Sequence, residues 1–138
     1  MKSYLVILLL VFCASIQYAH SQNLPSQTRR DTTPEEYSGL CQDAYEEKKD
    51  AILTLKYGHA CISKLRGKDD VDKANCLYYM GRIKYDTEEY NSAINFIDCS
   101  KKIYIKYNHI YGQYKCLILL GRVHEKQGRL VNALRSYK

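Results

Sequence analysis

The stretch ANCLYYMGRIKYDTEEYNSAINFIDCSKKIYIKY, residues 74–107, is echoed by YKCLILLGRVHEKQGRLVNALRSYK, residues 114–138. Matching residues recur 40 positions apart in the two stretches, as Cys76 and Cys116, Gly81 and Gly121, and Ala93 and Ala133. A period of this length is typical of helical repeats, in which each unit buries its apolar face only by stacking on its neighbours. We therefore expect an all-α chain of stacked helical hairpins rather than an enzyme core.

Residues 74–107 are predicted to form one such hairpin. Apolar residues recur at three- and four-residue spacing on both sides of the segment DTEEY, which indicates two amphipathic helices joined by a short turn. Gly81 and Ala93 lie where the two helices are expected to cross, and their small size lets the backbones approach closely. The same arrangement is expected for residues 114–138 around a turn at Gly128.

A degenerate first unit precedes these two. The residues that relate it to the second unit, at an offset of 42, are Gly39 with Gly81 and Ala51 with Ala93. Its first helix has a strong start signal, because Thr33 can cap the free amides, Pro34 suits the first helical position and Glu36 can complete a capping box. The charged segment 66–72 contains a glycine and is expected to be the loop to the second unit. The expected repeat domain therefore spans residues 34–138, with units at about 34–72, 74–110 and 114–138.

These units resemble tetratricopeptide repeats, in the long-period form found in scaffold proteins of cell polarity and synaptic clustering. The resemblance rests on the glycine at the helix crossing, the alanine that opens the second helix, and Tyr90 or Leu130 closing the turn. Lys84 and His124 depart from the family pattern, which usually has an aromatic or apolar residue at these places. The resemblance implies a helical-hairpin solenoid whose first helices line a concave groove that holds a peptide or a partner protein.

The groove implied by the resemblance is basic and aromatic. Its residues are Asn75, Tyr78, Arg82 and Tyr85 in the second unit, with Lys115, Ile118, Arg122 and Lys126 in the third. Tyrosine and arginine often anchor interfaces, so an acidic protein or peptide is the expected ligand. The alternative is that the basic residues are solvated charges on helix faces. The carboxylate clamp of chaperone-binding members of the family is not expected, because Leu119 stands where a clamp arginine would be.

The charge of the chain is unevenly distributed. The full chain has a net charge of +6, yet nine lysines and arginines from Cys99 onward accompany the single acid Glu125. This polarity suits an acidic partner, head-to-tail self-association or a solvated helix face. Nucleic acid is not expected as a partner: lysines and tyrosines alternate over residues 101–115, but the tyrosines fall at helical spacing and are more simply the edge of a packed helix.

The first 21 residues read as a secretory signal peptide. Lys2 is followed by an apolar run over residues 5–14, and Ala19 and Ser21 are small residues before a cleavage site. The alternative, a membrane anchor, needs about 20 apolar residues, more than this run contains. We therefore expect an extracellular protein without a membrane span after cleavage.

Residues 22–33 are expected to form a disordered arm or a pro-segment. The segment is polar and aperiodic and contains the dibasic pair formed by Arg29 and Arg30. This pair is either a second processing site, cut after Arg30, or two solvated arginines in a mobile arm.

Five cysteines remain once Cys13 leaves with the signal peptide, and an odd number in an oxidising compartment leaves one thiol unpaired. The repeat predicts the pairs Cys61–Cys76 and Cys99–Cys116, because each bond would join one unit to the next. Cys41 would then be unpaired and available for self-association. The alternative is that all five are buried thiols.

No constellation for catalysis or for a bound metal or cofactor is recognised. The cysteines have no close pair of the kind that zinc sites use, the histidines are scattered, and no serine stands in a nucleophile-elbow setting. We expect a secreted binding module without enzymatic activity; the alternative is a secreted effector or toxin-like polypeptide processed after Arg30. The last unit is read as truncated at Lys138, which would leave Leu130, Leu134 and Tyr137 partly uncovered, and self-association through this end is a further alternative.

Overall fold

The computed structural model describes residues 32–137, which contain six helices and no strand. The all-α fold predicted from the repeat is thereby confirmed. Residues Thr33–Lys138 form one compact unit. The predicted signal peptide and most of the predicted arm, with Ser21, Arg29 and Arg30, lie outside the described residues. Among the helices that the structure describes, none has the length and apolar character that a membrane span requires.

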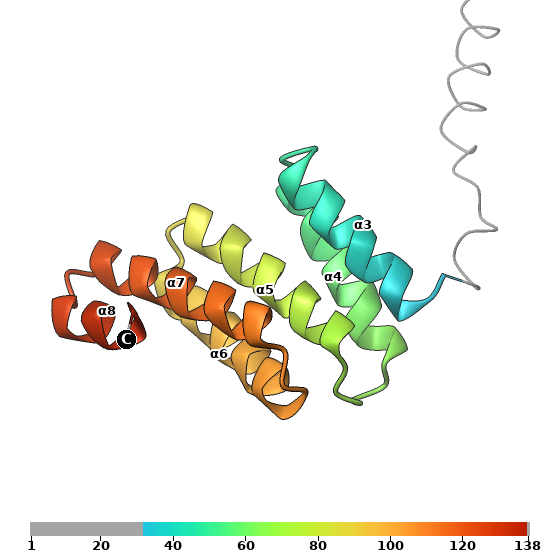
Figure 1. Cartoon of the computed structure of the whole chain (residues 1–138). Coiled ribbons are helices and arrows are strands. Elements are labelled where there is room, and N and C mark those ends of the chain that lie inside the picture. Colours follow the sequence, from blue (N-terminus) through green and yellow to red (C-terminus); the bar gives the residue numbers. More distant parts are fainter. Residues whose placement is uncertain (1–31, 138) are drawn as a thin grey trace, which may run out of the picture. The chain divides into compact units, whose positions relative to one another are not determined.

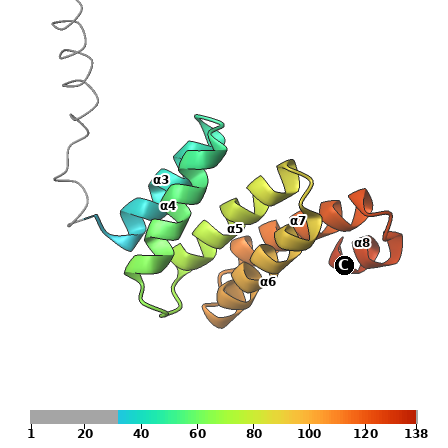
Figure 2. The ribbon, with the colours of Figure 1, turned by 180° about the vertical axis from the view of Figure 1, so that it is seen from behind.

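The six helices pair into three antiparallel hairpins (Figure 1). The pairs are α3 (Pro34–Glu46) with α4 (Ala51–Lys64), α5 (Val71–Asp86) with α6 (Tyr90–Lys106), and α7 (Ile110–Lys126) with α8 (Leu130–Tyr137). Each helix contacts the next one along the chain, and α5 in addition contacts both α3 and α7. The three first helices therefore lie in the order α3, α5, α7, and Figure 2 shows α4 and α6 from the opposite side.

Helix α3 begins with the predicted capping box. The Thr33 hydroxyl accepts a hydrogen bond from the Glu36 backbone N–H at 3.2 Å, and the Glu36 carboxylate accepts one from the Thr33 backbone N–H at 2.8 Å. Pro34 is the first helical residue, where its missing N–H costs nothing because that amide would have no helical partner. The sequence therefore predicted this boundary correctly.

Helices α5 and α7 begin about one turn earlier than expected. Helix α5 starts at Val71, because the Asp70 carboxylate accepts a hydrogen bond from a backbone amide of the first turn. Helix α7 starts at Ile110, because the His109 imidazole accepts one from the Gly112 N–H at 3.0 Å. The unit starts predicted near residues 74 and 114 were therefore too late, since the two capping residues had been assigned to the connections.

The chain reverses by similar turns at four places. One residue with positive φ stands two positions before the next helix, and these residues are Lys49, Glu88, Asn108 and Gly128. In the last three turns the following residue donates its backbone N–H to the carbonyl five positions back, at 2.8 Å or 2.9 Å. This closure belongs to the Schellman type, which satisfies carbonyls at the end of a helix. Only Gly128 and Asn108 are residue types that favour positive φ, so sequence alone does not reveal that the turn repeats.

The helix crossings of the second and third hairpins are as tight as predicted. A Cβ atom at Gly81 would lie 2.8 Å from Ile97 Cγ1 and 3.5 Å from the Ala93 carbonyl oxygen. At Gly121, the corresponding Cβ would overlap the ring of Tyr137. Glycine is therefore required at both positions by the close approach of the second helix.

The first hairpin follows a different register from the one predicted. Gly39, matched to Gly81 at an offset of 42, has no atom near its Cβ position, so it is not a crossing residue. The residue buried at the crossing is instead Cys41, whose Sγ donates to the Thr54 carbonyl oxygen at 3.3 Å. Cys41 stands 40 positions before Gly81, so the period of 40 holds here and the offset of 42 was wrong.

The core extends between the hairpins, whereas the last helix is only partly covered. Large side chains that are fully or almost fully buried include Tyr79, Met80, Ile97, Tyr104 and Val123. On α8, Ala133 is buried, but Leu130 and Leu134 are 66% and 62% exposed and Tyr137 is 42% exposed, as predicted.

Candidate partner-binding groove

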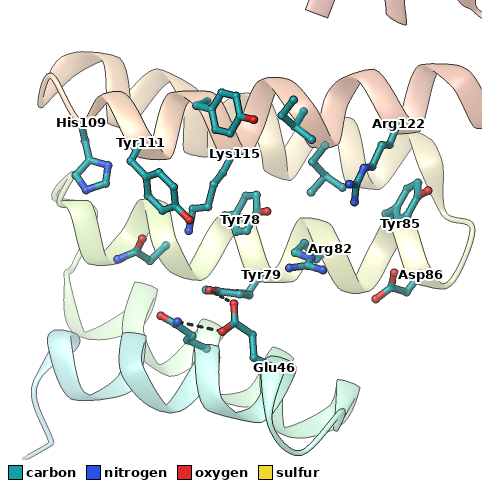
Figure 3. A pocket seen from close by; sticks show the side chains of 15 residues that line it. Glu46, Tyr78, Tyr79, Arg82, Tyr85, Asp86, His109, Tyr111, Lys115 and Arg122 are labelled. Carbon is teal, nitrogen blue, oxygen red and sulfur yellow. Dashed lines mark hydrogen bonds between the residues drawn. The ribbon is translucent and has the colours of Figure 1, made fainter. Parts of the chain in front are cut away.

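A pocket of about 730 Å³ runs along the first helices α3, α5 and α7. Seven of the eight predicted groove residues line it: Asn75, Tyr78, Arg82, Tyr85, Lys115, Ile118 and Arg122. Lys126 does not line the pocket and is exposed at the end of α7. Figure 3 shows Lys115 and Arg122 extending from α7 toward α5, while Glu46 faces α5 from α3. The structure therefore brings the predicted residues together from α5 and α7 and adds residues of α3 to the groove.

Lys115 lies among aromatic rings on the α7 side of this groove. Its Nζ atom is 4.6 Å from the ring centroid of Tyr78, 5.5 Å from that of Tyr79 and 5.3 Å from that of Tyr111. The electron-rich faces of such rings attract an ammonium group. Lys115 is partly buried, and none of the salt bridges among the described residues includes it. The rings, and no carboxylate, therefore surround this positive charge at close range.

The environment of Lys115 disfavours its protonated form. Burial, with a smaller effect from the positive charge of Arg82, lowers the pKa of Lys115, although Cys116 and Glu46 oppose the shift. A bound anion beside the ammonium would act in the opposite direction and stabilise the protonated form. Lys115 is therefore placed where an anionic ligand has a large effect.

Two arginines continue the basic row beyond Lys115, toward the C-terminal ends of α5 and α7 (Figure 3). The guanidinium of Arg82 lies over the ring of Tyr45, with a distance of 4.3 Å from Cζ to the ring centroid. Arg122 is exposed at the wall formed by α7. Neither arginine takes part in a salt bridge in the part of the chain that the structure describes. The groove thus contains three cations that form no salt bridge among the described residues, although Glu46 lies near enough to Arg82 and Lys115 for their charges to lower its pKa.

The acids of the groove are already hydrogen-bonded by tyrosine hydroxyls. Tyr79 Oη donates to Glu46 at 2.7 Å, and Tyr45 Oη donates to Asp86 at 2.7 Å. The side-chain amide of Gln42 donates a third hydrogen bond, to the second carboxylate oxygen of Glu46 at 3.2 Å. These bonds hold the two carboxylates in place, and neither carboxylate forms a salt bridge among the described residues.

The protonation states of this hydrogen-bonded group follow from its contacts. Burial works to raise the pKa of Glu46, but the bonds from Tyr79 and Gln42 and the positive charges of Arg82 and Lys115 outweigh it, so this pKa lies below its ordinary value. Burial and the bond to Asp86 raise the pKa of Tyr45 to about 12, and burial and Glu46 raise that of Tyr79 as well. At neutral pH both tyrosines are therefore donors and Glu46 is a carboxylate.

Several residues of the groove were missed in the sequence. Gln42 and Glu46 form the α3 wall, and Gln42 stands 40 residues before Arg82, so the correct period would have identified it. Tyr111 and Tyr114, interpreted as the edge of a packed helix, instead line the groove and are 66% and 59% exposed. Their rings add apolar contact area beside the basic row.

The five cysteines of the described residues are all free thiols, so neither predicted disulfide is formed in the structure. Cys99 is exposed, whereas Cys116 is buried with its Sγ 3.5 Å from Ser100 Oγ, an arrangement that does not favour their pairing. Cys41, predicted to be available to another copy, is completely buried, so the thiol that a second molecule can reach is Cys99.

No group of side chains suited to holding a metal ion occurs among residues 32–137. No family model matches the chain, and no curated protein and no solved structure matches it either. The resemblance to tetratricopeptide repeats therefore stays a prediction, and the function has to be inferred from the geometry of the groove.

Proposed function

We propose that this protein is a secreted binding module without catalytic activity, which holds an acidic segment of a protein or peptide in the groove of α3, α5 and α7. The observation that carries the proposal is the row formed by Arg82, Lys115 and Arg122, which has no carboxylate partner among the described residues and is bordered by tyrosine rings. A tetratricopeptide-like solenoid is proposed with it. Its support is that α5 contacts both α3 and α7 whereas α3 and α7 make no contact with each other.

The energetics favour a ligand with carboxylates. An aspartate or glutamate side chain that reaches Lys115 forms a charge-assisted hydrogen bond, which typically contributes about 1.5–3 kcal/mol. It also offsets the cost of burying the ammonium, which is expressed in the lowered pKa of Lys115. The rings of Tyr111 and Tyr114 can cover the apolar parts of the bound chain.

The two walls of the groove also set the orientation of the ligand. Glu46 and Asp86 lie toward α3 and the end of α5, and they repel acidic side chains. Lys115 and Arg122 project from α7 and attract them (Figure 3). An acidic ligand is therefore expected to place its carboxylates against α7 and its neutral side against α3.

Charge reversal in the groove tests this proposal. The double variant Arg82→Glu with Arg122→Glu is compared with Lys126→Glu with Arg129→Glu, which changes the net charge equally on residues outside the pocket. Fluorescence anisotropy of a labelled glutamate-rich peptide is expected to show binding lost in the first variant and retained in the second. Equal affinity of both variants for the peptide would reject the groove.

The extracellular location is tested by the N-terminus of the native product. Mass spectrometry is expected to find a chain that begins at Gln22, as signal cleavage after Ser21 requires. A product that begins at Asp31 would instead support the alternative of an effector processed after Arg30, and a product that begins at Met1 would contradict secretion through a cleaved signal.

A further inference from the structure

Three thiols meet where the first hairpin packs against α5. Cys41 comes from α3, Cys61 from α4 and Cys76 from α5, and each of them is 0% exposed. The three parent helices contact one another in all three combinations, so the cluster lies at their common junction. Cys99 and Cys116 do not belong to it, because Cys99 is exposed and Cys116 packs against Ser100.

Cys76 is the central member of the cluster. Its thiol lies beside the thiols of both Cys41 and Cys61, and these neighbours, together with burial, raise the pKa of Cys76. The other two thiols donate their protons elsewhere: Cys41 Sγ to the Thr54 carbonyl oxygen at 3.3 Å, and Cys61 Sγ to the Pro34 carbonyl oxygen at 3.4 Å. The sulfurs of Cys41 and Cys61 are therefore anchored to backbone atoms, each beside Cys76.

We propose that this cluster is a disulfide-forming site in which Cys76 pairs with either Cys41 or Cys61, and the third thiol stays free beside the bond. This differs from the pairing expected from the repeat, which assigned Cys61 to Cys76 and left Cys41 unpaired. In the structure Cys41 and Cys61 are equivalent candidates, since both are fully buried and both contact the Cys76 thiol.

The chemistry of the site requires a disulfide oxidant, such as oxidised glutathione or a protein with an oxidised dithiol. The two cysteine thiols lose two protons and two electrons as their S–S bond forms, and the oxidant accepts them and is reduced to two thiols. Once one bond exists, the third cysteine can attack it as a thiolate and release the displaced cysteine, which exchanges one bond for the other without net oxidation. Because the site is closed to solvent, the first bond forms during folding or local opening.

Either bond ties α5 to the first hairpin. The Cys41–Cys76 bond joins α3 to α5 and closes the longer loop, whereas the Cys61–Cys76 bond joins α4 to α5 across the connection over residues 65–70. A bond that closes a loop restricts the unfolded chain, so the oxidised protein is expected to unfold at a higher urea concentration than the reduced protein.

Disulfide mapping of the purified protein tests the site directly. The reduced protein is equilibrated with reduced and oxidised glutathione, quenched and alkylated with N-ethylmaleimide in acidified denaturant, and then digested with trypsin. Cleavage after Lys49, Lys64, Lys73 and Arg82 leaves the three cysteines on separate peptides. We expect cross-linked peptides that join Cys76 to Cys41 and Cys76 to Cys61, with Cys99 alkylated. Alkylated Cys76 in the oxidised protein, or a Cys41–Cys61 bond as the main product, would overturn the proposal.

Single variants separate the two bonds. In Cys41→Ala we expect Cys76 to pair only with Cys61, and in Cys61→Ala only with Cys41. Cys116→Ala is the matched buried control, in which both alternative bonds of Cys76 should still be found. If Cys76 formed no disulfide in either Cys41→Ala or Cys61→Ala, while each variant was still helical by circular dichroism, the proposal would also be contradicted. The readout does not involve the groove, so it stands whether or not an acidic peptide binds.

Discussion

The first hairpin, α3 with α4, and the second, α5 with α6, share a backbone plan but differ in what they place at equivalent positions. At the helix crossing the second hairpin has Gly81, whereas the first has Cys41. One residue further along, on the groove face, the second has Arg82 and the first has Gln42. The comparison teaches that the repeat specifies the turn and the crossing, while the charge of the groove changes from one hairpin to the next.

This difference gives the groove two unlike walls. On the α3 side, Glu46 is held by Tyr79 and Gln42, and its negative charge persists to lower pH than that of a free glutamate because its pKa is lowered. On the α7 side, Lys115 and Arg122 have no carboxylate partner among the described residues. The predictions below break or sharpen this contrast, beginning with the largest expected effect.

Lys115→Met removes the partly buried cation of the basic wall and keeps a long side chain among the rings. We expect the affinity for a glutamate-rich peptide to fall roughly 10- to 150-fold, the loss of about 1.5–3 kcal/mol typical of one charged hydrogen bond. Isothermal titration calorimetry measures the change.

The matched control is Lys126→Met, which lies outside the pocket and is expected to leave the affinity unchanged. The folded protein should not lose stability in Lys115→Met, because burial disfavours the charged form of this lysine. A variant that loses stability but not affinity would show that Lys115 has a structural role only.

Gly81→Ala and Gly39→Ala compare the crossing of the second hairpin with the predicted but incorrect crossing of the first. The new methyl group at residue 81 meets Ile97 at 2.8 Å, and overpacking of this kind costs about 1–3 kcal/mol. At residue 39 nothing lies within 4 Å, so the better helix propensity of alanine should stabilise the fold by about 0.5–1 kcal/mol. Urea denaturation followed by circular dichroism measures both changes, and equal effects at the two sites would contradict the corrected register.

Glu46→Gln makes the α3 wall less acidic while an amide oxygen stays available to Tyr79. We expect a gain in affinity of about 1.4- to fivefold for the acidic peptide, in line with roughly 0.2–1 kcal/mol for an exposed charge. Calorimetry of Glu47→Gln, a neighbouring acid that does not line the pocket, provides the comparison. A loss of affinity in Glu46→Gln would indicate that this carboxylate contacts the ligand favourably.

The smallest expected effect is the change in peptide affinity with pH, which is slight near neutrality and grows at alkaline pH. Because the pKa of Lys115 lies below its ordinary value of 10.5, the ammonium loses its proton earlier than an exposed lysine as pH rises. Binding of the acidic peptide should therefore weaken as the pH rises above neutrality. The folded protein itself should become more stable between the lowered pKa and 10.5, because the cost of burying a charged lysine is relieved as Lys115 loses its proton. Titrations at increasing pH should show this alkaline loss in the natural protein and not in Lys115→Met.

The sequence predicted the hairpins and most of the groove because both depend on local periodic patterns. The spacing of Gly81 and Gly121 identified the period, and seven of the groove residues implied by the resemblance to tetratricopeptide repeats line the pocket. The register of the first hairpin was not predictable in the same way, since Cys41 takes the place of the crossing glycine. Gly39 offered a chance match that only packing could reject.

The details of the site that were missed depend on contacts between distant helices. Nothing in the local sequence indicates that Tyr79 on α5 donates to Glu46 on α3, or that Lys115 lies over Tyr78. The helix starts at Val71 and Ile110 were missed because Asp70 and His109 cap them with side chains that also occur often in loops. Cys41, Cys61 and Cys76 likewise come together only through the packing of three helices, which their spacing in the sequence does not reveal.

The central claim is that the groove recognises acidic side chains, and a matched pair of peptides tests it most directly. One labelled peptide contains glutamates, and the other has the same length with glutamine at each of these positions. Fluorescence anisotropy at low and high salt is expected to show that the glutamate peptide binds and that its affinity falls as salt screens the charges, while the glutamine peptide does not bind. Equal binding of the two peptides, or no binding of the glutamate peptide at low salt, would contradict the claim.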